Sequence, residues 1–217
     1  MSQLAVLAPS TPAGEALARS ADKGDIPPEL GGMASAAAVA ALMKNNPRML
    51  VRLIAGWLST REAIWWGCLC QSQLLKVHET PGPTERLRAI VNWVKEPGDA
   101  TRAAVGAPGD GDSTPVDMLA SAVGFCTDNI SPSKEHPVAC PPGVVHKMVA
   151  LSILAAANKW PGPNRKECLH HFIELGLDVA EGKHLWAEGA VPKHPGLRGN
   201  DAFSTSLRGS GNIWENW

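Results

Sequence analysis

The stretch NPRMLVRLIAGWLS, residues 46–59, and its continuation TREAIWWGCLCQ, residues 60–71, decide the fold. Asn46 and Pro47 are typical of a helix start, because asparagine caps the first turn and proline tolerates its first position. The pattern predicts an amphipathic helix over 48–58. Its large apolar residues recur at helical spacing, at Leu50, Leu53, Ile54, Trp57 and Leu58.

A second helix start lies directly after the first helix. Ser59 and Glu62 have the spacing of a capping box, in which each side chain binds the other residue's backbone N–H. The run from Ala63 to Cys70 that follows carries no charge. We therefore predict a helix over 60–77 that is buried on nearly all sides. The residues predicted to form the structural core are Trp57, Trp65, Trp66, Cys68 and Trp93.

Helix signals of the same kind extend in both directions from this stretch. They predict helices over about 13–22, 33–43 and 143–158. A helix over 85–96 is capped by Thr84, and a short helix follows that is capped by Asp99. A further helix begins at Pro115 with Thr114 and Asp117 as its cap, and the last helix, over 165–182, is capped by Asn164 with Glu167. The sequence shows no hairpin signal and no alternation of strands with helices. The predicted fold class is all-α, an irregular multi-helix bundle of antiparallel helices with an extended C-terminal tail.

The composition changes after Trp186. Residues 1–186 are predicted to form one helical domain, partly irregular over 1–30, and residues 187–217 an extended tail rich in Gly, Ser and Pro. Aromatic residues, which a plain spacer does not need, mark the tail and its start: Trp186, Phe203, Trp214 and Trp217. Because tryptophan is a preferred interface anchor, two alternatives stay open. The tail wraps its own domain, or it docks these residues into a partner.

Charge and hydropathy exclude several classes of partner. The net charge is −1 and the basic residues are scattered, so nothing indicates nucleic-acid binding. No stretch approaches the about 20 apolar residues that span a bilayer. The N-terminus lacks the positive start and the long apolar run of a signal peptide. We therefore expect a cytoplasmic protein without a membrane or nucleic-acid partner. Its oligomeric state is left open.

Cysteine and histidine are the candidate metal or redox residues. Cys68 and Cys70 lie two residues apart, about 200° around a helix axis, so they could hold one metal ion between them only if the helix broke there. Cys168 and His171 have the spacing of half a metal site, which Cys140 or His146 would have to complete. An odd number of cysteines without an export signal favours free thiols. We predict no metal and no cofactor.

An enzymatic alternative stays open. It would be a metal- or thiol-dependent enzyme whose reactive groups come from the cysteine and histidine residues. The sequence contains no nucleophile elbow, no zinc-protease motif and no phosphate-binding loop. The residues that such an enzyme would use are Cys68, Cys70, His146, His170 and His171.

Four blocks of the sequence resemble an uncharacterised family of bacterial proteins that is encoded beside type VI secretion genes. The block GWLSTREAIWWGCLCQS, residues 56–72, is similar to the family's hALPxREAVWWACLCAR. Three later blocks are similar in the same order, so that the resemblance extends from about 46 to 186: VNWVKEPGDATRAAV, TPVDMLASAVGFCTDNISPSKEHPV and FIELGLDVAEGKHLW. The chain departs from the family at GFCTDN, where the family has an aromatic residue and a glycine-serine turn.

The resemblance implies an accessory role in secretion. The family's gene neighbours are effectors, spike-tip proteins with PAAR repeats, and effector chaperones. A chaperone, co-chaperone or adaptor that helps to load an effector onto the spike is therefore implied, with no catalytic residue carried over. We predict that it binds its partner through Trp214, Trp217, Trp186 and Phe203. A homo-oligomeric scaffold is a further alternative.

Overall fold

The computed structural model describes residues 5–78, 81–107, 113–131 and 135–187. Its helices are α1 (Ala13–Ala18), α2 (Ser35–Asn45), α3 (Pro47–Trp57), α4 (Thr60–His78), α5 (Pro81–Lys95), α6 (Asp99–Val105), α7 (Pro115–Gly124), α8 (Val144–Asn158) and α9 (Arg165–Ala180). Two 3-10 turns, Lys23–Asp25 and Pro28–Leu30, lie between α1 and α2. The described residues contain no strand, so the prediction of an all-α fold is confirmed.

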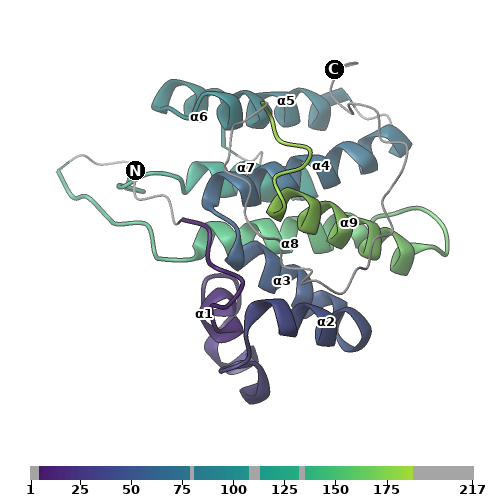
Figure 1. Cartoon of the computed structure of the whole chain (residues 1–217). Helices are drawn as coiled ribbons and strands as arrows, with labels where there is room; N and C mark the ends of the chain where they lie inside the picture. The colour runs from purple at the N-terminus through teal and green to yellow at the C-terminus, as the bar shows by residue number, and fades with distance from the viewer. Residues whose placement is uncertain (1–4, 79–80, 108–112, 132–134, 188–217) are drawn as a thin grey trace.

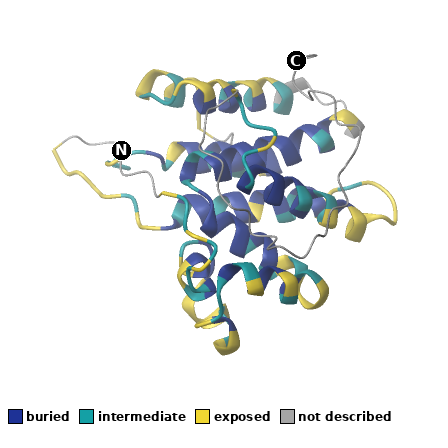
Figure 2. Ribbon diagram, in the orientation of Figure 1, coloured by how far each residue is buried: buried dark blue, intermediate teal, exposed yellow. Residues whose placement is uncertain are grey.

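Helices α4 and α8 form the centre of the bundle. α8 packs against α3, α4, α7 and α9, and α4 also packs against α5, α7 and α9. Figure 1 shows α5 and α6 along one side of the molecule and α1 and α2 at the opposite side. The buried residues concentrate between these two sides (Figure 2). The uncharged face of α4 is therefore covered by neighbouring helices, as its sequence requires.

The helix starts at 46–62 have the predicted caps. Asn46 Oδ1 accepts a hydrogen bond from the Met49 backbone N–H at 3.1 Å. At the start of α4, the Ser59 N–H donates to Glu62 Oε2 at 2.9 Å, and the Glu62 N–H donates to Ser59 Oγ at 3.3 Å. These bonds satisfy backbone groups that have no partner inside the helix. The tight turn between α3 and α4 is thus stabilised by its own side chains.

The predicted core residues lie in the core of the structure. Trp57, Trp65, Trp66, Cys68 and Trp93 are each at most 1% exposed. Close packing of α4 against α9 sets the position of Trp66, whose indole N–H donates to the Phe172 carbonyl at 2.7 Å. A Cβ atom added at Gly176 of α9 would overlap the Trp66 ring. A glycine is therefore needed where this indole crosses α9.

Helix α5 begins three residues before its predicted cap. We predicted Thr84 as the cap because proline and glycine residues precede it, but α5 starts at Pro81 and Thr84 lies in its first turn. The N–H groups of a first turn have no carbonyl partner inside the helix, so proline loses no hydrogen bond there. These prolines therefore open α5, and the prediction of Thr84 as its cap was wrong.

Asp99 also differs from its predicted role. It is the first residue of α6, after Gly98 at the capping position, and its carboxylate binds Arg102 Nη2 at 2.8 Å. The prediction of Asp99 as a cap was therefore wrong by one position. A carboxylate in the first turn is still favourable, because it faces the positive end of the helix dipole.

The last two predicted helix caps give opposite results. Thr114 and Asp117 form the complete capping box of α7. Asn164 precedes α9 as predicted, but its side chain makes no capping hydrogen bond, because its backbone (φ −86°, ψ 30°) is not extended. α9 ends at Ala180, two residues before the predicted end at Gly182.

Candidate partner-binding site

The chain crosses the start of α4 after α9 ends. Residues 181–187 run from the end of α9 toward α5 (Figure 1). Gly182 (φ 76°) and His184 (φ 54°) both have left-handed backbone conformations, which are uncommon for a residue with a side chain. The surroundings of His184 therefore hold it in this conformation. The segment carries Trp186, which we predicted to bind a partner.

Trp186 is half-buried and lies between an aromatic and a cationic side chain of α4. Its ring meets the Trp65 ring edge to face, with centroids 6.0 Å apart and an interplanar angle of 76°. The guanidinium carbon of Arg61 lies 4.4 Å from the Trp186 ring centroid, within cation–π range. We refer to Arg61, Trp65 and Trp186 together as the Trp186 clasp.

Arg61 is held in place by α5. Its Nε donates to the Val94 carbonyl at 2.6 Å and its Nη2 donates to the Lys95 carbonyl at 2.8 Å. Both carbonyls belong to the end of α5, where a cation also faces the negative end of the helix dipole. Burial lowers the pKa of Arg61 from its ordinary value, but a guanidinium stays charged near neutral pH. The clasp therefore presents a fixed positive charge to the indole ring.

Trp65 fixes the backbone of the crossing segment. Its indole N–H donates to the His184 carbonyl, two residues before Trp186. Trp65 is only 1% exposed and His184 is half-buried, so this hydrogen bond is partly shielded from solvent. The same side chain thus binds the segment's backbone through its N–H and the Trp186 ring through its own ring. Leu185, between the two contacts, is half-buried against the hydrophobic core.

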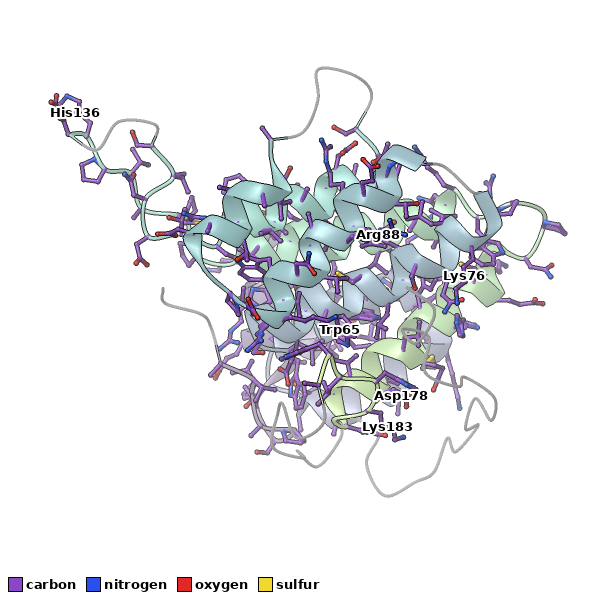
Figure 3. All side chains as sticks on the ribbon, turned by 90° about the horizontal axis from the view of Figure 1, so that it is seen from above. Trp65, Lys76, Arg88, His136, Asp178 and Lys183 are labelled. Atoms are coloured by element: carbon purple, nitrogen blue, oxygen red, sulfur yellow. The ribbon has the colours of Figure 1, made fainter. Side chains whose placement is uncertain are left out.

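Charged residues hold the turn that precedes Trp186. The Asp178 carboxylate is largely buried and lies 3.2 Å from Lys183 Nζ and 3.4 Å from His184 Nε2. Lys183 also binds Glu181 at 2.6 Å, and this hydrogen bond is the main cause of the raised pKa of Lys183. Figure 3 shows Trp65, Asp178 and Lys183 on one side of the molecule, far from His136 on the projecting loop. The segment is therefore attached at both of its ends.

The cysteines are poorly suited to nucleophilic chemistry. Cys68, Cys70, Cys126 and Cys168 are buried, and Cys140 is half-buried. Burial raises the pKa of every one of these thiols, to about 12 for Cys126 and Cys168. Thiols are nucleophilic only as thiolates, which such pKa values disfavour at neutral pH. The arrangement therefore favours packing over a thiol-dependent reaction.

The structure does not bring the predicted half of a metal site to a second half. Cys168 is buried, His170 is exposed and His171 is half-buried along α9. Within residues 5–78, 81–107, 113–131 and 135–187, no three His, Cys, Asp or Glu side chains gather in a group that would hold a metal ion. Cys140 and His146 thus do not complete a site with Cys168 and His171.

His146 is the most deeply buried histidine of the described chain. Its Nε2–H donates to the Leu58 carbonyl at 3.2 Å, while Nδ1 has no hydrogen-bond partner among the described residues. Burial lowers its pKa to about 4; the Leu58 carbonyl opposes this shift and Arg19 adds to it. The imidazole is therefore neutral at pH 7 and joins α8 to the end of α3.

Sequence reasoning missed Arg61, His184 and Asp178 as parts of this site. Arg61 and Trp65 are four residues apart, which places them on one face of a helix, so their proximity could be predicted from the sequence. Their contact with Trp186 could not be predicted, because Trp186 lies 121 positions after Trp65 in the chain. The other predicted binding residues, Phe203, Trp214 and Trp217, lie outside the described residues. The division into a domain and a tail therefore stays a prediction.

The comparisons with known proteins identify a family. A sequence profile of DUF6931, a family of unknown function, matches residues 38–180. The chain belongs to this family. The match includes Arg61 and Trp65 and stops before Trp186. No curated protein and no solved structure matches the chain.

None of the described helices has the length and the apolar character that crossing a bilayer requires.

Proposed function

We propose that this DUF6931 member is a non-catalytic accessory protein of type VI secretion that acts by binding other proteins. In this proposal it is a chaperone, co-chaperone or adaptor for an effector, an effector chaperone or a PAAR spike protein. The link to secretion rests on the four blocks that resemble a family encoded beside type VI genes. A cytoplasmic site of action follows from the same role, because loading precedes export.

The single observation that supports a binding role is the Trp186 clasp. Arg61 and Trp65 hold Trp186 at one place on the domain, so that the chain beyond residue 187 starts from a fixed point. That chain carries Phe203, Trp214 and Trp217 among small and polar residues. Tryptophan is enriched among the residues that contribute most to protein interfaces. Fixing the origin of such a segment lowers the entropy that binding would otherwise cost.

Co-purification tests this proposal. The tagged full chain is recovered from a strain that carries the secretion genes, and bound proteins are identified by mass spectrometry. We expect enrichment of an effector, an effector chaperone or a PAAR protein. The double variant Trp214→Ala/Trp217→Ala should reduce that enrichment at least tenfold. Leu151→Ala, which removes an exposed apolar side chain from α8 (46% exposed), is the matched control and should leave it unchanged.

Two results would count against the proposal. If none of the three protein classes is recovered, the proposed role in secretion is contradicted. Equal recovery of the partner by the tail variant and by the Leu151→Ala control would show that Trp214 and Trp217 are not part of the interface. Light scattering on the purified chain tests the scaffold alternative, since a scaffold of this size must form a stable oligomer.

A further inference from the structure

The Trp186 clasp has two parts of different origin. Arg61 and Trp65 lie within residues 38–180, which match the family. Trp186 and the carbonyl of His184 lie beyond the matched region. The family domain therefore supplies a surface that receives a tryptophan, and the C-terminal extension supplies the tryptophan that occupies it.

The receiving surface recognises a short segment by three contacts. The Trp65 N–H binds a backbone carbonyl, which any residue provides. The next residue, Leu185, packs half-buried against the core. The Trp65 ring and the Arg61 guanidinium then contact the tryptophan that follows. The chemistry that fits is any residue, then an aliphatic residue, then tryptophan.

The tail contains a second segment of this kind. Residues 212–214 are Asn-Ile-Trp, which repeats the pattern of His-Leu-Trp at 184–186. Trp217 does not fit the pattern, because Asn216 precedes it. The chain therefore carries one further candidate for the same surface and one tryptophan nearby that serves as a control.

We propose that Arg61 and Trp65 form a receptor for an aliphatic–tryptophan segment, that Leu185–Trp186 occupies it in the resting chain, and that Ile213–Trp214 of the same chain competes for it. When Ile213–Trp214 enters, Trp186 is released from the domain. The inference concerns a site on the folded domain, so it goes beyond the proposed function and does not depend on which partner the protein binds.

Loop length decides which segment prevails. Trp186 follows Ala180, the last residue of α9, by 6 positions, and Trp214 follows it by 34. The entropy of closing a flexible loop grows with its length, which favours the nearer segment by about tenfold. The left-handed His184 works in the opposite direction, because this conformation is unfavourable outside glycine. Competition within a single chain is therefore balanced closely enough to be measured.

A labelled peptide of sequence Asn-Ile-Trp-Glu-Asn, residues 212–216, is the probe. Its binding to full-length variants is measured by fluorescence polarisation, after circular dichroism and thermal melting have shown that each variant is folded. Trp186→Ala/Trp214→Ala removes the tryptophan from both internal segments and should bind the peptide. Trp186→Ala alone should bind at least tenfold more weakly, because Trp214 still competes within the chain. Wild type should bind more weakly still.

Control variants test each contact. Trp186→Ala/Trp217→Ala should behave like Trp186→Ala alone, since Trp217 lacks the preceding aliphatic residue. In the Trp186→Ala/Trp214→Ala background, Trp65→Phe keeps a ring but removes the N–H donor, and it should weaken binding about tenfold. Arg61→Met in the same background keeps an unbranched side chain without the charge and should also weaken binding. If Trp186→Ala fails to fold, Trp186→Leu retains apolar contact without the ring and replaces it in every arm.

The outcomes separate the parts of the inference. A folded Trp186→Ala/Trp214→Ala protein that does not bind the peptide overturns the receptor. Binding that is unchanged by Trp65→Phe and Arg61→Met places the peptide elsewhere and overturns it as well. If Trp217→Ala has the same effect as Trp214→Ala, the aliphatic–tryptophan pattern is wrong.

Discussion

Trp65 and Trp66 are adjacent in the sequence but stabilise different parts of the molecule. Both indole N–H groups donate to a backbone carbonyl, Trp66 to Phe172 within α9 and Trp65 to His184 beyond it. Successive helix residues point about 100° apart. Trp66 therefore faces the interior between α4 and α9, whereas Trp65 faces the edge that the C-terminal segment crosses.

This difference separates a global from a local role. The interior is covered by helices on all sides, so a change there affects the whole bundle. The Trp186 clasp is a single layer over the start of α4, so its loss releases the end of the crossing segment, residues 185–187, and leaves the helices in place. Four predictions test this separation, in order of decreasing effect.

Trp66→Ala should have the largest effect. It removes a fully buried ring and leaves a cavity between α4 and α9, which should lower the free energy of unfolding by about 3–5 kcal/mol. Urea denaturation measures this change. Trp65→Phe is the matched control, because it retains an aromatic ring. It loses the hydrogen bond to His184 and part of the ring volume, which together should cost about 1–2 kcal/mol. Equal losses for the two variants would erase the distinction between interior and edge.

Acid should weaken the interior through His146. Its pKa of about 4 in the folded chain lies below the ordinary 6.5, so the unfolded chain binds the proton more tightly. The stabilisation is complete above pH 6.5 and is lost as the pH falls toward 4, by about 3 kcal/mol. Urea denaturation at several pH values measures this loss. His146→Gln should flatten the pH dependence over that range; a profile that stays unchanged would contradict the buried neutral imidazole.

Trp186→Ala should have a smaller and local effect. The edge-to-face contact and the cation–π contact together account for about 1–2 kcal/mol. Trypsin cleavage after Lys183 should become faster, because the segment is no longer held by the clasp. Trp160→Ala is the control: Trp160 is also half-buried and meets Phe172 edge to face at 6.2 Å, but it lies away from this segment. Faster cleavage in both variants would show that the effect is not specific to the clasp.

Cys70→Ala should have the smallest effect. It removes one buried sulfur atom, at a cost of about 1 kcal/mol, and no reactive group. In the native protein the half-buried Cys140 should react with a thiol reagent before the four buried cysteines do. A stably folded Cys70→Ala protein that no longer recovers its partner would show that the thiol has a function.

Local signals in the sequence predicted most of the helices. Asn46, Ser59 with Glu62, and Thr114 with Asp117 start helices as expected, because each cap needs only residues within one turn. The errors at Thr84 and Asp99 are also local, since more than one residue near each start can begin the helix. Neither error changes which residues are buried.

The candidate site was predictable only in part. Trp186 was a candidate because a plain spacer does not need an aromatic residue. The spacing of Arg61 and Trp65 placed these two residues on one helix face. Their meeting with Trp186 required α9 to run antiparallel to α4 and end beside its start. No pattern within a window of neighbouring residues contains that information.

The sequence by itself determined the helical class, the uncharged face of α4 and the burial of its tryptophans and cysteines, because propensity, capping and periodicity act within one or two turns. The tertiary structure alone decided that Trp65 would bind the chain beyond α9 while Trp66 bound α9 itself. The reason is that the packing of α4 against α9 decides which backbone carbonyl lies beside each indole N–H. The stretch TREAIWWGCLCQ thus contributes residues both to the interior of the bundle and to the Trp186 clasp, in which its Arg61 and Trp65 contact Trp186.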